Sequence, residues 1–112
     1  MLIFKIVHAR EWRDAERIGE YFGSDKDRAD GFLHFSSAEQ LVDTLAKYYT
    51  DHSNLVLVAI DAEEFGSELK FEKSRSGALF AHLYGALPVI AVKWTKSLGL
   101  NAGRVVLPDL TA

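Results

Sequence analysis

Two histidines that lie far apart in the sequence stand where they could support chemistry. His34 lies in the stretch DGFLHFSS, and Ser36 follows it two positions later. Because alternate residues of a strand point to the same side, a strand here would aim the imidazole and the hydroxyl of Ser36 together. An imidazole can give or take a proton near neutral pH. The structural alternative is that His34 bonds a backbone carbonyl and that Ser36 or Ser37 only caps the next helix.

A second segment, FEKSRSGALFAHLYG, combines Glu72, Arg75, His82 and Tyr84 with two glycines. The guanidinium of Arg75 suits a phosphate or carboxylate because it can bind with two parallel hydrogen bonds. If the backbone is extended, His82 and Tyr84 share a face. A surface ion pair between Glu72 and Arg75 and a core position for Tyr84 are the structural alternatives. We predict one pocket that combines both segments; its residues are His34, Ser36, Arg75, His82 and Tyr84.

The elements that must position these residues follow from the apolar pattern. Helical spacing predicts helices over Ala9–Tyr21 and Ser37–Tyr49, the second opened by a capping box of Ser37 with Gln40 or of Ser36 with Glu39. Gly23–Asp30 reads as a loop, and Lys73–Tyr84 fits neither pattern clearly. Strands are predicted at Leu2–Val7, Gly31–Phe35, Leu55–Ile60, Leu69–Glu72, Pro88–Trp94 and Arg104–Leu107. This order predicts a single compact α+β domain over residues 1–112, with a mixed, mostly antiparallel sheet and two main helices.

Composition narrows the classes of function. The chain has 112 residues, of which 48% are hydrophobic, so it can form a core without disulfides or structural metal ions. It has no cysteine, which excludes disulfides and thiolate zinc sites, and its four histidines lack the spacing of metal ligands. A net charge of −3 argues against nucleic acid as the partner. No apolar run is long enough to span a membrane. We therefore expect a cytoplasmic protein; composition gives no oligomeric state.

Over residues 2–95 the chain resembles the domain-of-unknown-function 952 (DUF952) family. The tail after Trp94 lies outside this resemblance. The segments that carry it are Ile3–Ile6, Glu11-Trp12, Ser24, Asp27–Ser36, Leu55–Leu57 and Glu72–Gly85.

The family is grouped with the ADP-ribosyltransferase superfamily, which implies an ADP-ribosyltransferase-like fold and an NAD-type ligand. In that superfamily a strand-borne His, followed by a small residue and then Ser or Thr, contacts the ribose and the nicotinamide amide. His34 and Ser36 match these positions, with Phe35 in place of the usual glycine. The resemblance makes Glu72 the candidate for the acidic residue that stabilises the ribosyl cation, His82 a second polar contact and Tyr84 a stacking residue. The catalytic set is then His34, His82 and Glu72, and the cofactor-binding set is His34, Ser36, Arg75 and Tyr84.

The residues leave two further functions open. His34-Phe35-Ser36 is similar to half of the signature of two-histidine phosphoesterases, in which two imidazoles act as acid and base on a phosphodiester. The second half is missing, because His82 is followed by Leu83 and Tyr84. The other alternative is a binding module that holds a small-molecule nucleotide without turnover. The resemblance makes transfer or hydrolysis of an ADP-ribosyl group the first hypothesis.

Overall fold

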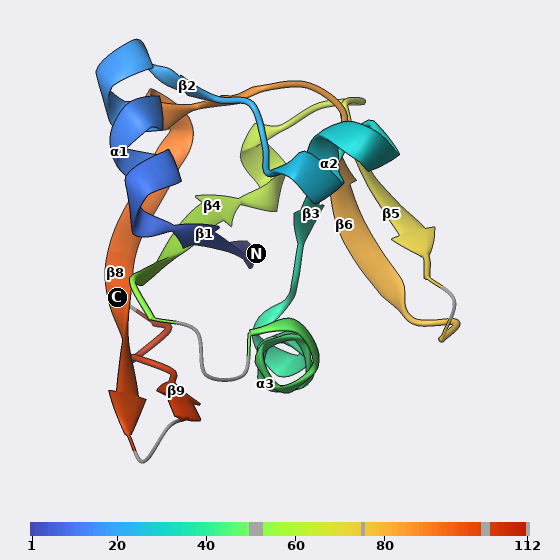
Figure 1. The fold of residues 1–112 in the computed structure, drawn as a ribbon. Coiled ribbons are helices and arrows are strands. Elements are labelled where there is room, and N and C mark those ends of the chain that lie inside the picture. The colour runs from blue at the N-terminus through green and yellow to red at the C-terminus, as the bar shows by residue number, and fades with distance from the viewer. Residues whose placement is uncertain (50–52, 75, 102–103, 112) are drawn as a thin grey trace.

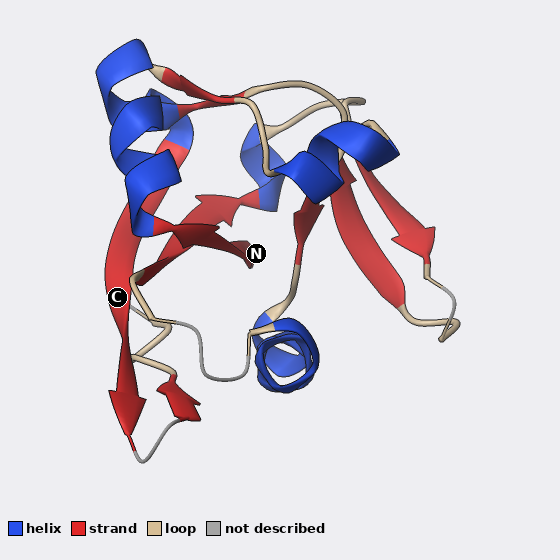
Figure 2. Ribbon diagram, viewed as in Figure 1, coloured by secondary structure: helices blue, strands red, loops and turns tan. Residues whose placement is uncertain are grey.

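The computed structural model describes residues 1–49, 53–74, 76–101 and 104–111. Its largest ladder has the strand order β1–β4–β8–β9 (Figures 1 and 2). Strand β4 (Leu55–Asp61) lies between β1 (Leu2–His8) and β8 (Val92–Asn101), and β9 (Arg104–Val106) pairs with the far end of β8. The prediction of a buried central strand at Leu55–Ile60 is confirmed, because β4 is covered on both faces.

A second ladder carries the histidines. Its strand order is β3–β6–β5, with β3 at Leu33–Phe35, β6 at Leu79–Leu83 and β5 at Leu69–Lys73. A short pair, β2 (Glu20–Tyr21) with β7 (Leu87–Pro88), forms a third ladder. The predicted sheet is thus three ladders, and every described strand pair is antiparallel.

One isolated bridge connects the two larger ladders. Phe4 of β1 and Ser36, just after β3, exchange both backbone hydrogen bonds at 2.8 Å. Lys5, the residue after the bridge in β1, is therefore carried to the junction between the ladders.

Helix α1 (Ala9–Ile18) is shorter than predicted. It buries Trp12 and Ala15 as its spacing implies, but it stops at Gly19, which adopts φ 99°. Glycine reaches this left-handed region at little cost, so it commonly ends a helix. Ile18 is 61% exposed and Phe22, beyond the end, is 55% exposed. The prediction of a helix that continues to Tyr21 is wrong, and the helical spacing of Ile18 and Phe22 does not bury either side chain.

The predicted loop at Gly23–Asp30 contains a helix, α2 (Asp25–Asp30). Ser24 and Asp27 form a reciprocal capping box: each side chain bonds the other residue's backbone N–H. Such a box satisfies two of the N–H groups that a helix start leaves without partners. The loop prediction is wrong because this Ser-x-x-Asp spacing caps a helix and does not form an isolated turn.

Helix α3 (Ala38–Tyr48) confirms the prediction in outline. Its capping box is Ser37 with Gln40, the first of the two predicted pairs, and it buries Leu41 and Leu45. Of the less regular segments, Lys73–Tyr84 supplies β6, whereas the predicted strand Pro88–Trp94 is interrupted by a 3₁₀ turn, η2 (Val89–Ala91). A further 3₁₀ turn, η1 (Ala62–Glu64), follows β4.

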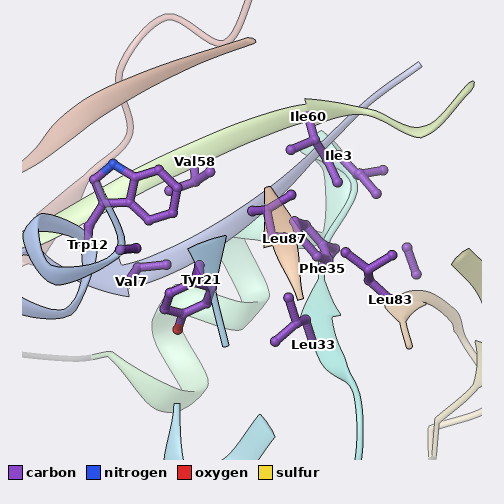
Figure 3. Close-up of a cluster of buried hydrophobic side chains, with 12 residues drawn as sticks. Ile3, Val7, Trp12, Tyr21, Leu33, Phe35, Val58, Ile60, Leu83 and Leu87 are labelled. Atoms are coloured by element: carbon purple, nitrogen blue, oxygen red, sulfur yellow. The ribbon is translucent and has the colours of Figure 1, made fainter. Parts of the chain in front are cut away.

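Two apolar clusters enclose the four-stranded ladder. The first lies between α1, the ladder and β3–β6, and includes Ile3, Val7, Trp12, Phe35 and Leu83 (Figure 3). The second lies under α3 and includes Phe4, Ile6, Leu41, Leu45 and Leu57. Alternate residues of β1 thus enter different clusters, as the two-residue strand period requires. The domain is α+β, as predicted. Among the described helices, none has both the length and the apolar content that crossing a bilayer requires.

Candidate functional site

Asp27 forms the buried centre of the site. Its residue is 2% exposed, although α2, which carries it, lies on the surface. Its Oδ1 accepts a hydrogen bond from the backbone N–H of His34 (3.2 Å) and lies 2.6 Å from His34 Nδ1. Its Oδ2 accepts from the N–H of Ser24 (2.9 Å) and lies 2.8 Å from Lys5 Nζ. A buried carboxylate is tolerated when it is paired and hydrogen-bonded in this way.

Lys5 supplies the compensating charge from the other ladder. Its side chain is 7% exposed, and Nζ donates to the carbonyl of His34 (3.0 Å) as well as to Asp27. Desolvation lowers the pKa of Lys5, with Asp27 acting against that shift. For Asp27, burial alone would raise the pKa, but the hydrogen bond with His34 and the charge of Lys5 outweigh it and hold the pKa well below its usual range. At neutral pH Asp27 is therefore ionised.

His34 has a carboxylate at each ring nitrogen. Nδ1 meets Asp27, and Nε2 lies 3.0 Å from Oδ2 of Asp30, the last residue of α2. When the ring carries both protons, each nitrogen donates to a carboxylate. The side chain remains 31% exposed, so solvent reaches it.

His82 stands directly opposite His34 on the neighbouring strand. Its Nδ1 lies 2.8 Å from Glu72 Oε1, and the hydroxyl of Tyr84 donates to that same oxygen (2.7 Å). The hydrogen bond from Tyr84 lowers the pKa of Glu72 most, and the hydrogen bond with His82 lowers it further. Glu72 in turn raises the pKa of Tyr84. Glu72 is therefore an ionised carboxylate at neutral pH, with a side chain that is 38% exposed.

The ring of Phe32 gathers these groups into one cluster, which we call the ring cluster: Phe32, His34, His82 and Tyr84. The Phe32 ring is stacked on His82 with centroids 3.9 Å apart, and its centroid is 4.6 Å from that of His34 and 5.2 Å from that of Tyr84. The two imidazole centroids are 5.5 Å apart, edge to face. Together with Glu72, the cluster presents aromatic faces, two imidazoles and a carboxylate on one side of the three-stranded ladder.

The structure brings four of the predicted site residues together and separates one. His34, His82, Glu72 and Tyr84 meet at the ring cluster. Ser36 is 7% exposed, and its Oγ lies 3.1 Å from Oγ1 of Thr44 on α3. Its hydroxyl is thus directed to α3 and not to the imidazoles. Arg75 lies outside the described residues.

Four residues of the site were not among the predicted ones: Lys5, Asp27, Asp30 and Phe32. For Asp27 the sequence held a signal, the capping-box spacing from Ser24. For Lys5 the signal was a charged residue inside an apolar strand. For Phe32 the alternation of the predicted strand placed it on the face of His34, but its stacking partner His82 lies fifty residues further on and had no local signal.

Two hollows lie along the same edge of the molecule. One of about 230 Å³ is lined by residues that include Phe22, Arg28, Phe32 and Gly85. A smaller one of about 160 Å³ also includes Phe22 and Arg28, together with acidic residues of α1. Neither of these two hollows is lined by His34 or His82. No group of three or more metal-ligating side chains stands close enough to hold a metal ion within the part of the chain that the structure describes.

The fold and site define a small α+β domain with paired imidazoles on adjacent strands. The family model described as "Protein of unknown function (DUF952)" matches residues 6–95, and the chain belongs to this family. It is similar to the crystal structure of protein CC0527 from Caulobacter crescentus, with 46% identity and a TM-score of 0.90 over 94% of this chain and 92% of that one. The solution NMR structure of CC0527 matches with a TM-score of 0.85 at 46% identity, over 93% and 90% of the two chains. No curated protein matches.

Proposed function

We propose that the ring cluster binds a nucleotide of the NAD or ADP-ribose type. The protein then breaks the glycosidic bond of this nucleotide and transfers the ADP-ribosyl group to an acceptor or to water. The observation that carries this proposal is the Glu72 carboxylate, which Tyr84 and His82 fix beside exposed aromatic faces. The sequence resemblance to the ADP-ribosyltransferase superfamily, through the placement of His34, supports the same reaction class. An ADP-ribosyltransferase-like fold and a cytoplasmic location are part of the proposal.

The charges around the cluster favour this reaction. Cleavage of a ribosyl–nicotinamide bond passes through a cationic, oxocarbenium-like ribose. Glu72 and Asp30 place partly exposed carboxylates beside His82 and His34, and a carboxylate at the developing charge stabilises such a transition state. The planar nicotinamide ring would stack on Tyr84 or Phe32, as aromatic side chains do with planar ligand rings.

The proposed step conserves atoms and electrons. The bond between ribose C1′ and the nicotinamide nitrogen breaks, and its electron pair leaves with the nicotinamide, which departs neutral. Water or an acceptor nucleophile then bonds C1′. Its proton passes to Nε2 of His82, which holds a lone pair when Nδ1 donates to Glu72. Because the Ser36 hydroxyl is directed to Thr44, the nicotinamide amide would be held by other groups of the cluster.

Release of nicotinamide from NAD, followed by chromatography, tests this proposal. Glu72→Gln removes the charge but keeps the shape, and we expect it to lower the rate by about 100-fold or more, the usual effect of losing a transition-state electrostatic contact. Glu39→Gln, an exposed substitution on α3, is the matched control and leaves the rate unchanged. If NAD and ADP-ribose at millimolar concentration neither react nor shift the resonances of His82, the proposal is wrong. Binding without turnover would identify a binding module instead.

A second candidate is acid–base hydrolysis of a phosphodiester. The specific observation in its favour is the pair of imidazoles at opposed positions, each with Nδ1 against a carboxylate. In this arrangement Nε2 of His82 would act as the base, and His34, whose Nε2 faces Asp30, would act as the acid when its ring carries both protons. Hydrolysis of a 2′,3′-cyclic nucleotide that disappears in both His34→Ala and His82→Ala would favour this candidate over the first.

A further inference from the structure

We infer that the hollow of about 230 Å³ beside Phe32 is a second subsite, which takes the other aromatic base and a phosphate of a dinucleotide. This inference rests on the nucleotide-binding function proposed above and assigns a place to the second base and a phosphate of an NAD-type ligand.

Phe32 belongs both to the ring cluster and to the lining of the hollow. One face of its ring is stacked on His82, and the same residue lines the hollow. A ligand whose first ring lies at the ring cluster would therefore reach the hollow by passing along Phe32. Figure 1 shows the connection from β2 to α2, which contains Phe22, running beside the end of β3. The hollow and the ring cluster thus share Phe32.

The size of the hollow sets what can occupy it. Pockets that enclose a whole drug-sized ligand measure about 300–1,000 Å³. A hollow of about 230 Å³ is smaller than that range and fits one ring system with a short polar attachment. It holds part of a dinucleotide, and the remainder would lie on the ring cluster.

The lining chemistry matches a base with a phosphate. Phe22 is 55% exposed and lines the hollow across from the core, so its ring is available for stacking. Arg28 donates to the carbonyl of Gly23 and to Asp25, both at 2.6 Å, which uses two of its five N–H groups and fixes the guanidinium at the rim. The carboxylate of Asp27 also lines the hollow, but Lys5 and His34 compensate its charge.

The neighbouring hollow of about 160 Å³ limits how far the anionic part of the ligand extends. It shares Phe22 and Arg28 with the first hollow, but Glu11, Asp14 and Glu20 also line it. Three carboxylates repel a phosphate. The phosphate of the ligand therefore lies on the Phe32 side of Arg28, toward the imidazoles.

Titration of the isotope-labelled protein with AMP and, separately, with nicotinamide mononucleotide tests the subsite. AMP should shift the resonances of Phe22, Gly31 and Gly85, and nicotinamide mononucleotide those of His82 and Tyr84. Phe22→Ala should weaken AMP binding at least about five-fold, the lower end for losing one stacked base, and leave nicotinamide mononucleotide unaffected. Val42→Ala, which truncates an exposed residue of α3, is the control and changes neither.

A second variant tests the phosphate. Arg28→Gln should weaken the binding of AMP but not the binding of adenosine, because adenosine has no phosphate. If nicotinamide mononucleotide shifts His82 but AMP leaves the hollow unchanged, the subsite is refuted and the proposed function stands. If AMP binds at the hollow and nicotinamide mononucleotide does not bind at the ring cluster, the subsite exists but the proposed function fails. Equal AMP affinity of Phe22→Ala and the wild-type protein refutes the subsite.

Discussion

Removal of the Asp27 charge should destabilise the protein more than any surface substitution. Asp27→Asn leaves the ammonium of Lys5, whose side chain is 7% exposed, without its buried counter-charge. Breaking a buried ion pair by removing one partner costs about 3–5 kcal/mol. With a urea m-value of about 2 kcal/mol/M, that loss lowers the midpoint of unfolding by about 1.5–2.5 M. Circular dichroism during urea titration at pH 7 measures the shift.

Two controls make this expectation specific. Asp25→Asn changes a fully exposed carboxylate of the same helix, paired with Arg28, and should cost less than about 1 kcal/mol. The double variant Lys5→Met with Asp27→Asn removes both charges and should be more stable than Asp27→Asn alone, because no unpaired charge remains. If Asp27→Asn and Asp25→Asn unfold at the same urea concentration, or if the two changes at the pair are simply additive, the reasoning about the buried pair is refuted.

The same pair predicts how stability depends on pH. The pKa of Asp27 is lower in the folded protein than in the unfolded chain, so the unfolded state binds more protons between the two values. Its contribution to stability is fully present above the unfolded pKa of about 4 and is lost as the pH falls below it. The difference in stability between wild type and Asp27→Asn should therefore narrow below about pH 4. A difference that stays constant from pH 7 to pH 3 would contradict the shift.

Two further changes test separate features. Gly23→Ala should destabilise the protein clearly more than Gly19→Ala. Both glycines have a left-handed φ, but only at Gly23 would a Cβ lie 2.8 Å from neighbouring side-chain carbons. Equal midpoints of unfolding for the two variants would refute this clash. Tyr84→Phe removes the hydrogen bond that is the largest cause of the low pKa of Glu72. The pKa of Glu72 should therefore rise toward its ordinary value, which a carboxyl ¹³C titration measures. Tyr48→Phe on α3 is the control and should leave the pKa of Glu72 unchanged.

Local periodicity in the sequence predicted strands at the places of β1, β3, β4 and β5, but it did not predict β2 or β6. It placed His34 on a strand, whereas Lys73–Tyr84, which contains His82, fitted neither pattern. The structure places the two histidines at opposed positions on neighbouring strands. Which strands pair is a non-local property, and no pattern within Lys73–Tyr84 reveals its partner. The distance between the imidazoles and the stacking of Phe32 were therefore outside the reach of sequence reasoning.

The failed predictions have a common physical origin. Ser36 was expected to share a strand face with His34, but β3 ends at Phe35, the Ser36 backbone pairs with Phe4, and its hydroxyl lies 3.1 Å from Oγ1 of Thr44 on α3. For Asp27 the neighbouring sequence encodes only a local role, in a turn or as a capping residue, and the structure shows its capping box with Ser24. Its stronger role, as the counter-charge of Lys5, depends on a residue twenty-two positions away that only the folded chain brings near.

The bridge between Phe4 and Ser36 and the ion pair between Lys5 and Asp27 join the two larger ladders within one residue of each other along β1. Both attach at the β3 side of the three-stranded ladder, whereas β5, which carries Glu72, is the strand farthest from the bridge in the order β3–β6–β5. Loss of the ion pair should therefore act directly on β3 and His34, and reach the Glu72 carboxylate only through β6.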